Sequence, residues 1–203
     1  MTALILVDIQ NDFLPGGALA VPDGDAVIPV ANQLIGQHDL IVATQDWHPS
    51  DHISFAANHP GRRPYDVVEV AGLPQTLWPA HCVQFTGGAC LAPGLETARI
   101  ERVFPKGIDP DVDSYSGLFD NGRRRSTGLA DWLRSRQVAD VVICGLATDY
   151  CVRATALDAV SEGFRVRLVA DGCRGVNVSP GDDARALDEM REAGVSITPS
   201  HRL

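Results

Sequence analysis

The sequence predicts a single α/β domain over residues 1–203, with a doubly wound, mostly parallel six-stranded sheet flanked by helices. Three observations lead to this fold class. Runs rich in Val, Ile and Leu recur without polar alternation, which is typical of strands covered on both faces. Segments with a helical spacing of apolar residues lie between these runs. One long segment, residues 46–99, fits neither pattern and is expected to be a loop-rich insertion.

The expected elements alternate along the chain. Strands are expected at residues 3–8, 39–44, 100–105, 139–146 and 164–170, with a weaker one at 195–198. Four helices are expected from apolar residues that share one face: Val27, Val30, Ala31 and Leu34; Leu129, Trp132 and Leu133; Val152, Ala156, Ala159 and Val160; and Ala184, Leu187 and Met190. Pro29 is compatible with the first of these helices only in its first turn.

The segment 46–99 is too long for an ordinary connection and is rich in Pro, Gly and His. Long irregular segments inside compact domains are usually functional loops. This one contains Trp78-Pro-Ala-His81-Cys82 and begins with a cluster of possible metal ligands. We therefore expect it to bind a metal ion and to form one wall of the site.

Composition and charge exclude several classes of partner. The net charge of −9 argues against nucleic acid and anionic membranes, and no apolar run is long enough to span a bilayer. The start of the chain lacks the basic region of a signal peptide, so a cytoplasmic location is expected. Five cysteines at irregular spacings fit neither a disulfide framework nor a paired zinc motif, and reduced thiols are expected.

The stretch Ala43-Thr-Gln-Asp46-Trp-His48-Pro-Ser-Asp-His52 brings a carboxylate and two imidazoles together directly after an apolar run. In parallel sheets, ligands bind in the crevice beyond the carboxyl ends of the strands. Asp46 and His48 are two residues apart, so both side chains can point into one cavity. Such a ligand set suits zinc, iron or manganese. Taken alone, the cluster fits a metal site and a capped, solvated loop equally well.

Three further residues that could carry chemistry stand at ends of expected strands. Asp8 ends the first strand, where partial burial raises the pKa of a carboxylate and suits proton transfer; its alternative is a turn cap. Cys151 lies where a strand turns into a helix, whose free N–H groups could stabilise a thiolate; its alternative is inert packing. Lys106, beside Gly107, could hold Cys151 as thiolate, or could simply be exposed.

Position is the argument that connects these residues. Asp8, Asp46, Lys106 and Cys151 all follow strand-like runs that should lie side by side, so the sheet would gather them at one crevice. His81 is the expected third metal ligand, delivered by the long loop. His52 is expected either as a fourth metal ligand or as a pocket-lining residue. The aromatic residues Phe13, Trp78 and Tyr115 could enclose a flat ring, although core packing is their alternative.

Together these motifs resemble the bacterial nicotinamidases, which also hydrolyse pyrazinamide and belong to the isochorismatase-like cysteine hydrolases. The resemblance rests on Asp8-Ile-Gln-Asn-Asp-Phe13, Asp46-Trp-His48-Pro, Trp78-Pro-Ala-His81-Cys-Val, Phe104-Pro-Lys106-Gly and Gly145-Leu-Ala-Thr-Asp-Tyr-Cys151. It also covers Asp113-Ser-Tyr115-Ser and Asp171-Gly-Cys-Arg-Gly175, and so extends over nearly the whole chain.

The resemblance implies an isochorismatase-like fold and a catalytic triad of Asp8, Lys106 and Cys151. It implies one divalent metal ion, zinc before iron or manganese, on Asp46, His48 and His81. A cis peptide bond before Ala147 would orient the N–H groups of Ala147 and Cys151 as an oxyanion hole.

The implied reaction converts nicotinamide to nicotinate and ammonia through a thioester on Cys151, as a step of NAD salvage. In this reaction the metal ion would anchor the pyridine nitrogen. The implied partner is a small molecule, and a homo-oligomer is left open.

Two competing functions remain. A related hydrolase of the same fold could act on isochorismate or on an N-carbamoyl compound, but such enzymes typically lack the metal trio of Asp46, His48 and His81. A non-enzymatic metal-binding or interaction module would have no need of Asp8, Lys106 and Cys151 together. The sequence therefore favours the amidohydrolase.

Overall fold

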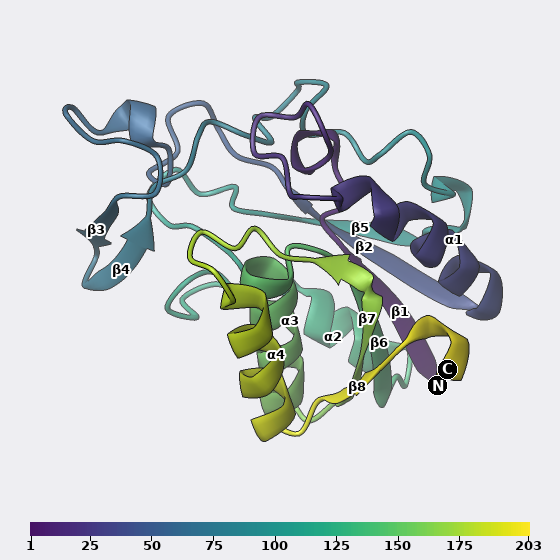
Figure 1. The fold of residues 1–203 in the computed structure, drawn as a ribbon. Helices are drawn as coiled ribbons and strands as arrows, with labels where there is room; N and C mark the ends of the chain where they lie inside the picture. Colours follow the sequence, from purple (N-terminus) through teal and green to yellow (C-terminus); the bar gives the residue numbers. More distant parts are fainter.

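The computed structural model describes all 203 residues and contains one six-stranded sheet in the order β5-β2-β1-β6-β7-β8 (Figure 1). Its strands are β1 Thr2–Val7, β2 Leu40–Asp46, β5 Arg102–Lys106, β6 Asp140–Leu146, β7 Arg165–Arg174 and β8 Ser196–Thr198. Every neighbouring pair is parallel. All six expected strands are confirmed, and β7 runs further than the 164–170 expected.

Four α-helices connect the strands: α1 Val27–Gln37, α2 Leu129–Ser135, α3 Arg153–Ser161 and α4 Asp182–Glu192. Figure 1 shows α1 on one face of the sheet and the other three on the opposite face, as a doubly wound fold requires. Pro29 is the third residue of α1, within its first turn, where a missing N–H costs nothing.

Two expected helices differ in detail from the structure. In α4 the fully buried residues are Ala186 and Met190, whereas Ala184 is exposed. The expected stripe was therefore shifted at its first position. The helix expected from Val152 is preceded by a wider π-helical turn, Thr148–Val152, so Cys151 lies inside this turn rather than at the first residue of α3.

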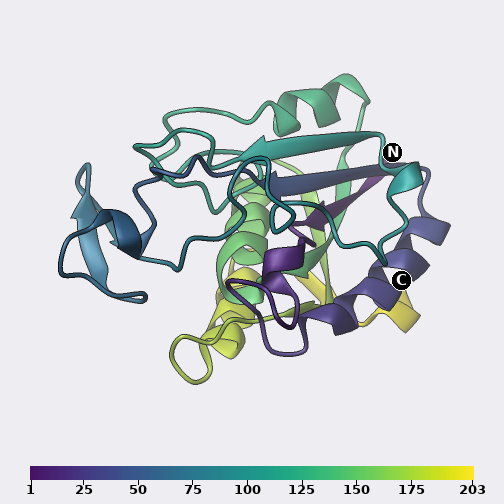
Figure 2. The ribbon, with the colours of Figure 1, turned by 90° about the horizontal axis from the view of Figure 1, so that it is seen from above.

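The segment 46–99 is less irregular than expected. It contains the 3₁₀ turns Ala56–Asn58 and Thr97–Arg99 and an antiparallel hairpin of β3 Val67–Val70 and β4 Leu73–Thr76. Figures 1 and 2 both show this hairpin standing away from the six-stranded sheet. Further 3₁₀ turns occur at Asn11–Phe13, Gly24–Ala26 and Ser200–Arg202.

The core is built on the central strand β1, in which Ala3 to Val7 are completely buried. Both neighbours, β2 and β6, are also buried along nearly their whole length. Burying a side chain such as Ile5 contributes about 1.5–3 kcal/mol. The strands in the middle of the sheet are therefore rigid supports for the residues at their carboxyl ends.

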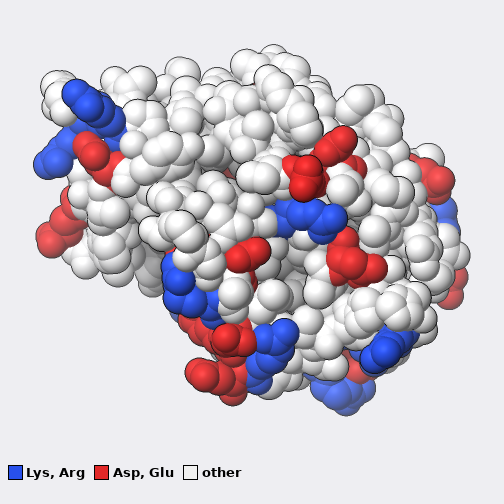
Figure 3. Space-filling view, viewed as in Figure 1, with Lys and Arg blue, Asp and Glu red and all other residues white.

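The outer surface carries charges of both signs. On the face shown in Figure 3, basic side chains are interspersed with acidic ones. Three ion pairs along α4 contribute to this mixture: Arg153 with Glu189, Arg185 with Asp182, and Arg191 with Asp188. None of the helices combines the length and apolar character needed to cross a membrane.

Candidate active site

The expected site residues meet at the carboxyl edge of the sheet because four adjacent strands end there. Lys106 is the last residue of β5 and Asp46 the last of β2, and the two are register partners. Asp8 directly follows β1, and Ala147 directly follows β6. Cys151 lies in the turn after β6. One acidic oxygen from each carboxylate and the Cys151 sulfur lie within 4.8 Å of one another.

The Lys106 ammonium is completely buried and lies among four partners. Its Nζ is 2.5 Å from Asp46 Oδ1, 2.9 Å from the Ser114 carbonyl oxygen and 3.3 Å from Cys151 Sγ, and it donates a hydrogen bond to each. An ammonium has only three N–H donors. The contact with Asp8, at 3.0 Å from Oδ2, is therefore an ion pair, and Asp8 Oδ2 has no hydrogen bond.

The two carboxylates differ in pKa although both are buried. Burial raises the pKa of Asp8 to about 6; Lys106 opposes this shift and the nearby Asp46 adds to it. For Asp46, burial acts in the same direction, but Lys106 and His48 outweigh it and hold the pKa well below its usual range. Asp8 is thus the group able to exchange a proton near neutral pH.

At the Cys151 thiol, the charge of Lys106 does not outweigh burial. Burial raises its pKa well above the usual value, and Lys106 lowers it by less than burial raises it. Lys106 has the expected position, since its Nζ donates to Cys151 Sγ, and its charge lowers the pKa of the thiol; burial acts more strongly, and Asp46 and Asp8 also raise this pKa. Those two carboxylates overcome the effect of burial and raise the pKa of Lys106 well above its usual value.

Asp46, His48 and His81 form a group that fits a metal ion. The Nδ1 atoms of His48 and His81 contact the carbonyl oxygens of Gly107 and Pro79, so the Nε2 atoms face Asp46 Oδ2 at 3.7 and 3.9 Å. Such separations suit ligands about 2.0–2.2 Å from a shared ion. The buried oxygen-and-imidazole donor set is that of a divalent metal site.

Gly107 allows this arrangement. It has a left-handed φ of 62°, and a Cβ there would lie 2.3 Å from the His48 ring. The absence of a side chain at Gly107 thus leaves the space that the His48 ring occupies.

His52 lies beside this group. Its Nδ1 is 2.7 Å from Ser54 Oγ, and its buried Nε2 has no hydrogen-bond partner. Its ring centroid is 4.3 Å from that of His48. Burial and His48 lower its pKa to about 4, which keeps the imidazole neutral. The possible metal-ligating atoms that cluster with His52 are those of His48 and Asp113, and not those of Asp46 and His81.

The turn after β6 has the expected cis peptide bond, between Leu146 and Ala147. The Ala147 carbonyl oxygen accepts hydrogen bonds from the N–H groups of Tyr150 and Val152. Gly145 is required here because its φ is 132° and a Cβ would lie 2.0 Å from the Val7 carbonyl oxygen. Both Ala147 and Cys151 line the adjacent pocket.

That pocket is small and largely aromatic. The expected residues Phe13, Trp78 and Tyr115 line it together with Asp46, His48, His81 and Cys151. Tyr150 also lines it and was missed by the sequence analysis; its place next to Cys151 was the available signal. Its ring centroid is 4.8 Å from Trp78 and 5.5 Å from Tyr115.

The sequence analysis also missed two residues that bond to the two acidic residues, one to the backbone of Asp46 and one to the carboxylate of Asp8. Gln10 is buried, and its amide both donates to the Asp46 carbonyl oxygen and accepts from the Asp46 N–H, each at 2.8 Å. Thr44 Oγ1 donates to Asp8 Oδ1 at 2.6 Å. Thr44 lies two residues before Asp46, so strand alternation could have placed both on the same face.

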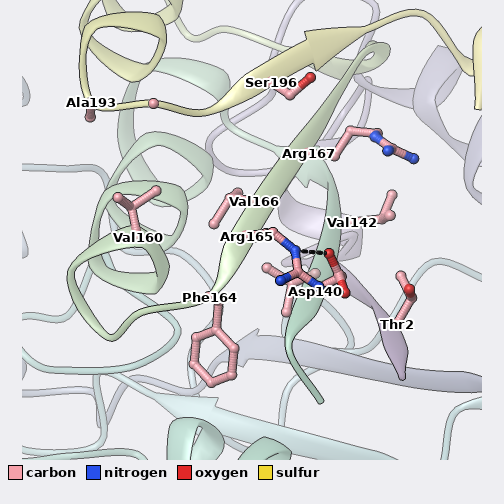
Figure 4. A pocket seen from close by; sticks show the side chains of 12 residues that line it. Thr2, Asp140, Val142, Val160, Phe164, Arg165, Val166, Arg167, Ala193 and Ser196 are labelled. Carbon is pink, nitrogen blue, oxygen red and sulfur yellow. Dashed lines mark hydrogen bonds and ion pairs between the residues drawn. The ribbon is translucent and has the colours of Figure 1, made fainter.

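A more spacious hollow lies at the opposite edge of the sheet (Figure 4). It is lined by Thr2, Asp140, Arg165 and Ser196, which are the first residues of their strands. Its Arg165 is paired to Asp140 through two contacts of 2.6 Å. The hollow brings together no nucleophile, proton acceptor and metal-ligand set, so size alone does not identify the functional site.

Comparison with known proteins agrees with this location. The model of the isochorismatase domain matches residues 2–201. The chain belongs to the isochorismatase family. It is 53% identical over 199 residues to the nicotinamidase of Escherichia coli strain K12, covering 96% of this chain and 93% of that protein.

Two solved structures of the family extend the comparison. The nicotinamidase/pyrazinamidase of Acinetobacter baumanii matches with a TM-score of 0.96 and 43% identity, covering 99% of this chain and 97% of that one. The pyrazinamidase of Pyrococcus horikoshii in complex with zinc matches with a TM-score of 0.80 and 43% identity, covering 98% of each chain. The predicted isochorismatase-like fold is therefore confirmed.

The raised pKa of Asp8 predicts an effect on stability. Its folded-state pKa of about 6 lies above the unfolded value near 3.8, so stability is lost as pH rises between these values. We expect Asp8→Asn to have the higher melting temperature at pH 7.5 and no advantage at pH 3.5, measured by circular dichroism after chelation of metals. A wild-type protein that is the more stable at pH 7.5 would contradict the direction of the shift.

Proposed function

We propose that this chain is a metal-dependent cysteine amidohydrolase that converts nicotinamide to nicotinate and ammonia, and pyrazinamide to pyrazinoate. The observation that carries the proposal is that two groups of residues meet beside one aromatic pocket. Cys151 lines the pocket and contacts Lys106 and Asp8 behind it, and the metal-ligand group of Asp46, His48 and His81 lines the same pocket. A nicotinamidase 53% identical over nearly the full chain supports the same substrate.

The geometry supports the following steps. Asp8 takes the proton of the Cys151 thiol as sulfur attacks the carboxamide carbon, because a resting thiol needs a base within reach. The N–H groups of Ala147 and Cys151 bind the oxyanion, an effect worth about 3–4 kcal/mol per donor. Asp8 returns the proton to the departing ammonia. Water then cleaves the thioester and releases nicotinate, and the thiol is restored.

Lys106 assists by its charge. It opposes the effect of burial on Asp8 and so keeps a useful fraction of that carboxylate ionised at neutral pH. It also donates to Cys151 Sγ, which steadies the sulfur as negative charge develops there. Because the negative charges of Asp46 and Asp8 raise its pKa, Lys106 remains protonated throughout the reaction.

The metal ion would be held by Asp46, His48 and His81, with zinc favoured over iron or manganese because a related pyrazinamidase is seen in complex with zinc. When bound, it supplies a Lewis-acidic anchor for the ring nitrogen of the substrate. Phe13, Trp78 and Tyr115 would enclose the ring. His52, whose Nε2 lacks a partner, would line the site next to the ion.

The alternative substrates, isochorismate and N-carbamoyl compounds, are disfavoured by the same residues. A buried metal group suits a ring with a nitrogen acceptor, and the small pocket with aromatic walls suits a flat ring better than a bulky substrate. A cytoplasmic location, a role in NAD salvage and a homo-oligomeric state remain predictions.

The nucleophile assignment predicts the effect of Cys151→Ala. We expect it to lower ammonia release from nicotinamide by at least about a thousandfold, because no other sulfur faces the pocket. The assay compares nicotinamide with N-carbamoylsarcosine and includes metal analysis of the same sample. Cys90→Ala, at an exposed cysteine, is the control and should keep full activity. Near-normal turnover by Cys151→Ala would refute the assignment, and turnover of N-carbamoylsarcosine alone would replace the substrate.

The metal assignment predicts a different effect for Asp46→Asn. Loss of the anionic ligand should lower the metal content at least about tenfold, measured by plasma mass spectrometry after dialysis. It should also raise KM for nicotinamide, because the ring loses its anchor. Asp51→Asn, at an exposed carboxylate in the same loop, is the control. Unchanged metal content in Asp46→Asn would remove Asp46 from the ligand set.

A further inference from the structure

The hairpin β3–β4 buries one side chain, and that side chain is polar. Of its eight strand residues, only Gln75 is buried, at 3% exposure, while the others are exposed or half-buried. The hairpin stands away from the main sheet in Figures 1 and 2, so it adds little to the core. A buried amide without hydrogen-bond partners is strongly unfavourable. The partners of Gln75 therefore explain its position.

Those partners are residues of the pocket wall. The amide nitrogen of Gln75 has two N–H donors. Its Nε2 is 2.8 Å from the Thr76 carbonyl oxygen and 2.9 Å from Asp113 Oδ2, and its longer contact of 3.3 Å with the Tyr115 hydroxyl shares one of these N–H groups. Trp78 Nε1 donates to the same Tyr115 hydroxyl at 3.2 Å. The Tyr115 oxygen is thus held from two directions, by Gln75 of the hairpin and by Trp78 just after it.

This network orients the surfaces that would meet a substrate. Asp113, Tyr115 and Trp78 all line the pocket, whereas Gln75 does not. The other oxygen of Asp113, Oδ1, accepts a hydrogen bond from the Ser114 N–H at 2.8 Å. The hydrogen bond from Gln75 therefore fixes the Oδ2 end of this carboxylate. Without Gln75, the hydroxyl of Tyr115 and one oxygen of Asp113 would each lose a donor in a buried environment.

We propose that Gln75 is a positioning residue that sets substrate affinity by holding Tyr115 and Asp113 in place, so that the hairpin supports the pocket wall from outside. The inference rests on the proposed function, since the affinity in question is that for a flat aromatic carboxamide. It assigns no role in bond making or breaking to Gln75, which lies outside the pocket lining. Its effect therefore falls on KM and not on kcat.

The test is a double-mutant cycle of Gln75→Met and Tyr115→Phe. Methionine keeps the length of the side chain and removes its donors, so KM for nicotinamide should rise about fivefold while kcat stays within about twofold. Tyr115→Phe should have a similar effect. The double variant should raise KM by clearly less than the product of the two single effects, because both changes remove the contact between Gln75 and Tyr115. Calorimetric affinity for nicotinate should weaken by the same factor in each variant.

Controls separate this role from a merely structural one. Glu69→Gln changes an exposed residue of the same hairpin and should leave KM unchanged. If Gln75→Met fails to fold, Gln75→Glu replaces it; it keeps the shape but places a second carboxylate beside Asp113, and KM should rise further.

Two outcomes would overturn the inference: an unchanged KM in folded Gln75 variants, or effects that multiply to about 25-fold in the double variant. Failure of the proposed function has a different signature, since the wild-type protein would then release no ammonia. The inference would fall with it.

Discussion

The buried ammonium of Lys106 is the interaction on which the site depends. A charge at this depth without oppositely charged and hydrogen-bonding partners would be strongly unfavourable. Here two carboxylates, a carbonyl oxygen and a sulfur surround it, each delivered by a different segment. The sheet order β5-β2-β1-β6 makes this possible, because it places three of the four segments side by side.

The two carboxylates that contact this ammonium have different roles. Asp46 receives a hydrogen bond from it and also faces two imidazoles, so it remains an anion suited to hold a cation. Asp8 receives only an ionic contact, and its Oδ2 is left without a hydrogen bond. At Asp8, burial outweighs the effect of Lys106 and raises the pKa to about 6, so this carboxylate can take up and return a proton. At Asp46, Lys106 and His48 outweigh burial and hold the pKa well below its usual range.

The sequence was sufficient to place the strand-end residues, because parallel strands deliver their carboxyl ends to a common edge. Asp8, Asp46, Lys106 and Cys151 were predicted on that ground, and the structure brings them together. The sequence could not reveal the thiol state of Cys151, since burial and the competition for Lys106 are three-dimensional properties. Gln10 and Gln75 were missed for a related reason: each acts through partners that are distant in the chain.

The dependence of kcat/KM on pH tests the central claim most directly. If Asp8 is the proton acceptor, with burial raising its pKa to about 6 against the opposing Lys106, kcat/KM for nicotinamide falls tenfold per pH unit well below pH 6. The fall reflects protonation of Asp8, and the profile levels off above that pH. A profile that stays flat down to pH 4 would show that no buried carboxylate of raised pKa takes part, and would contradict the account.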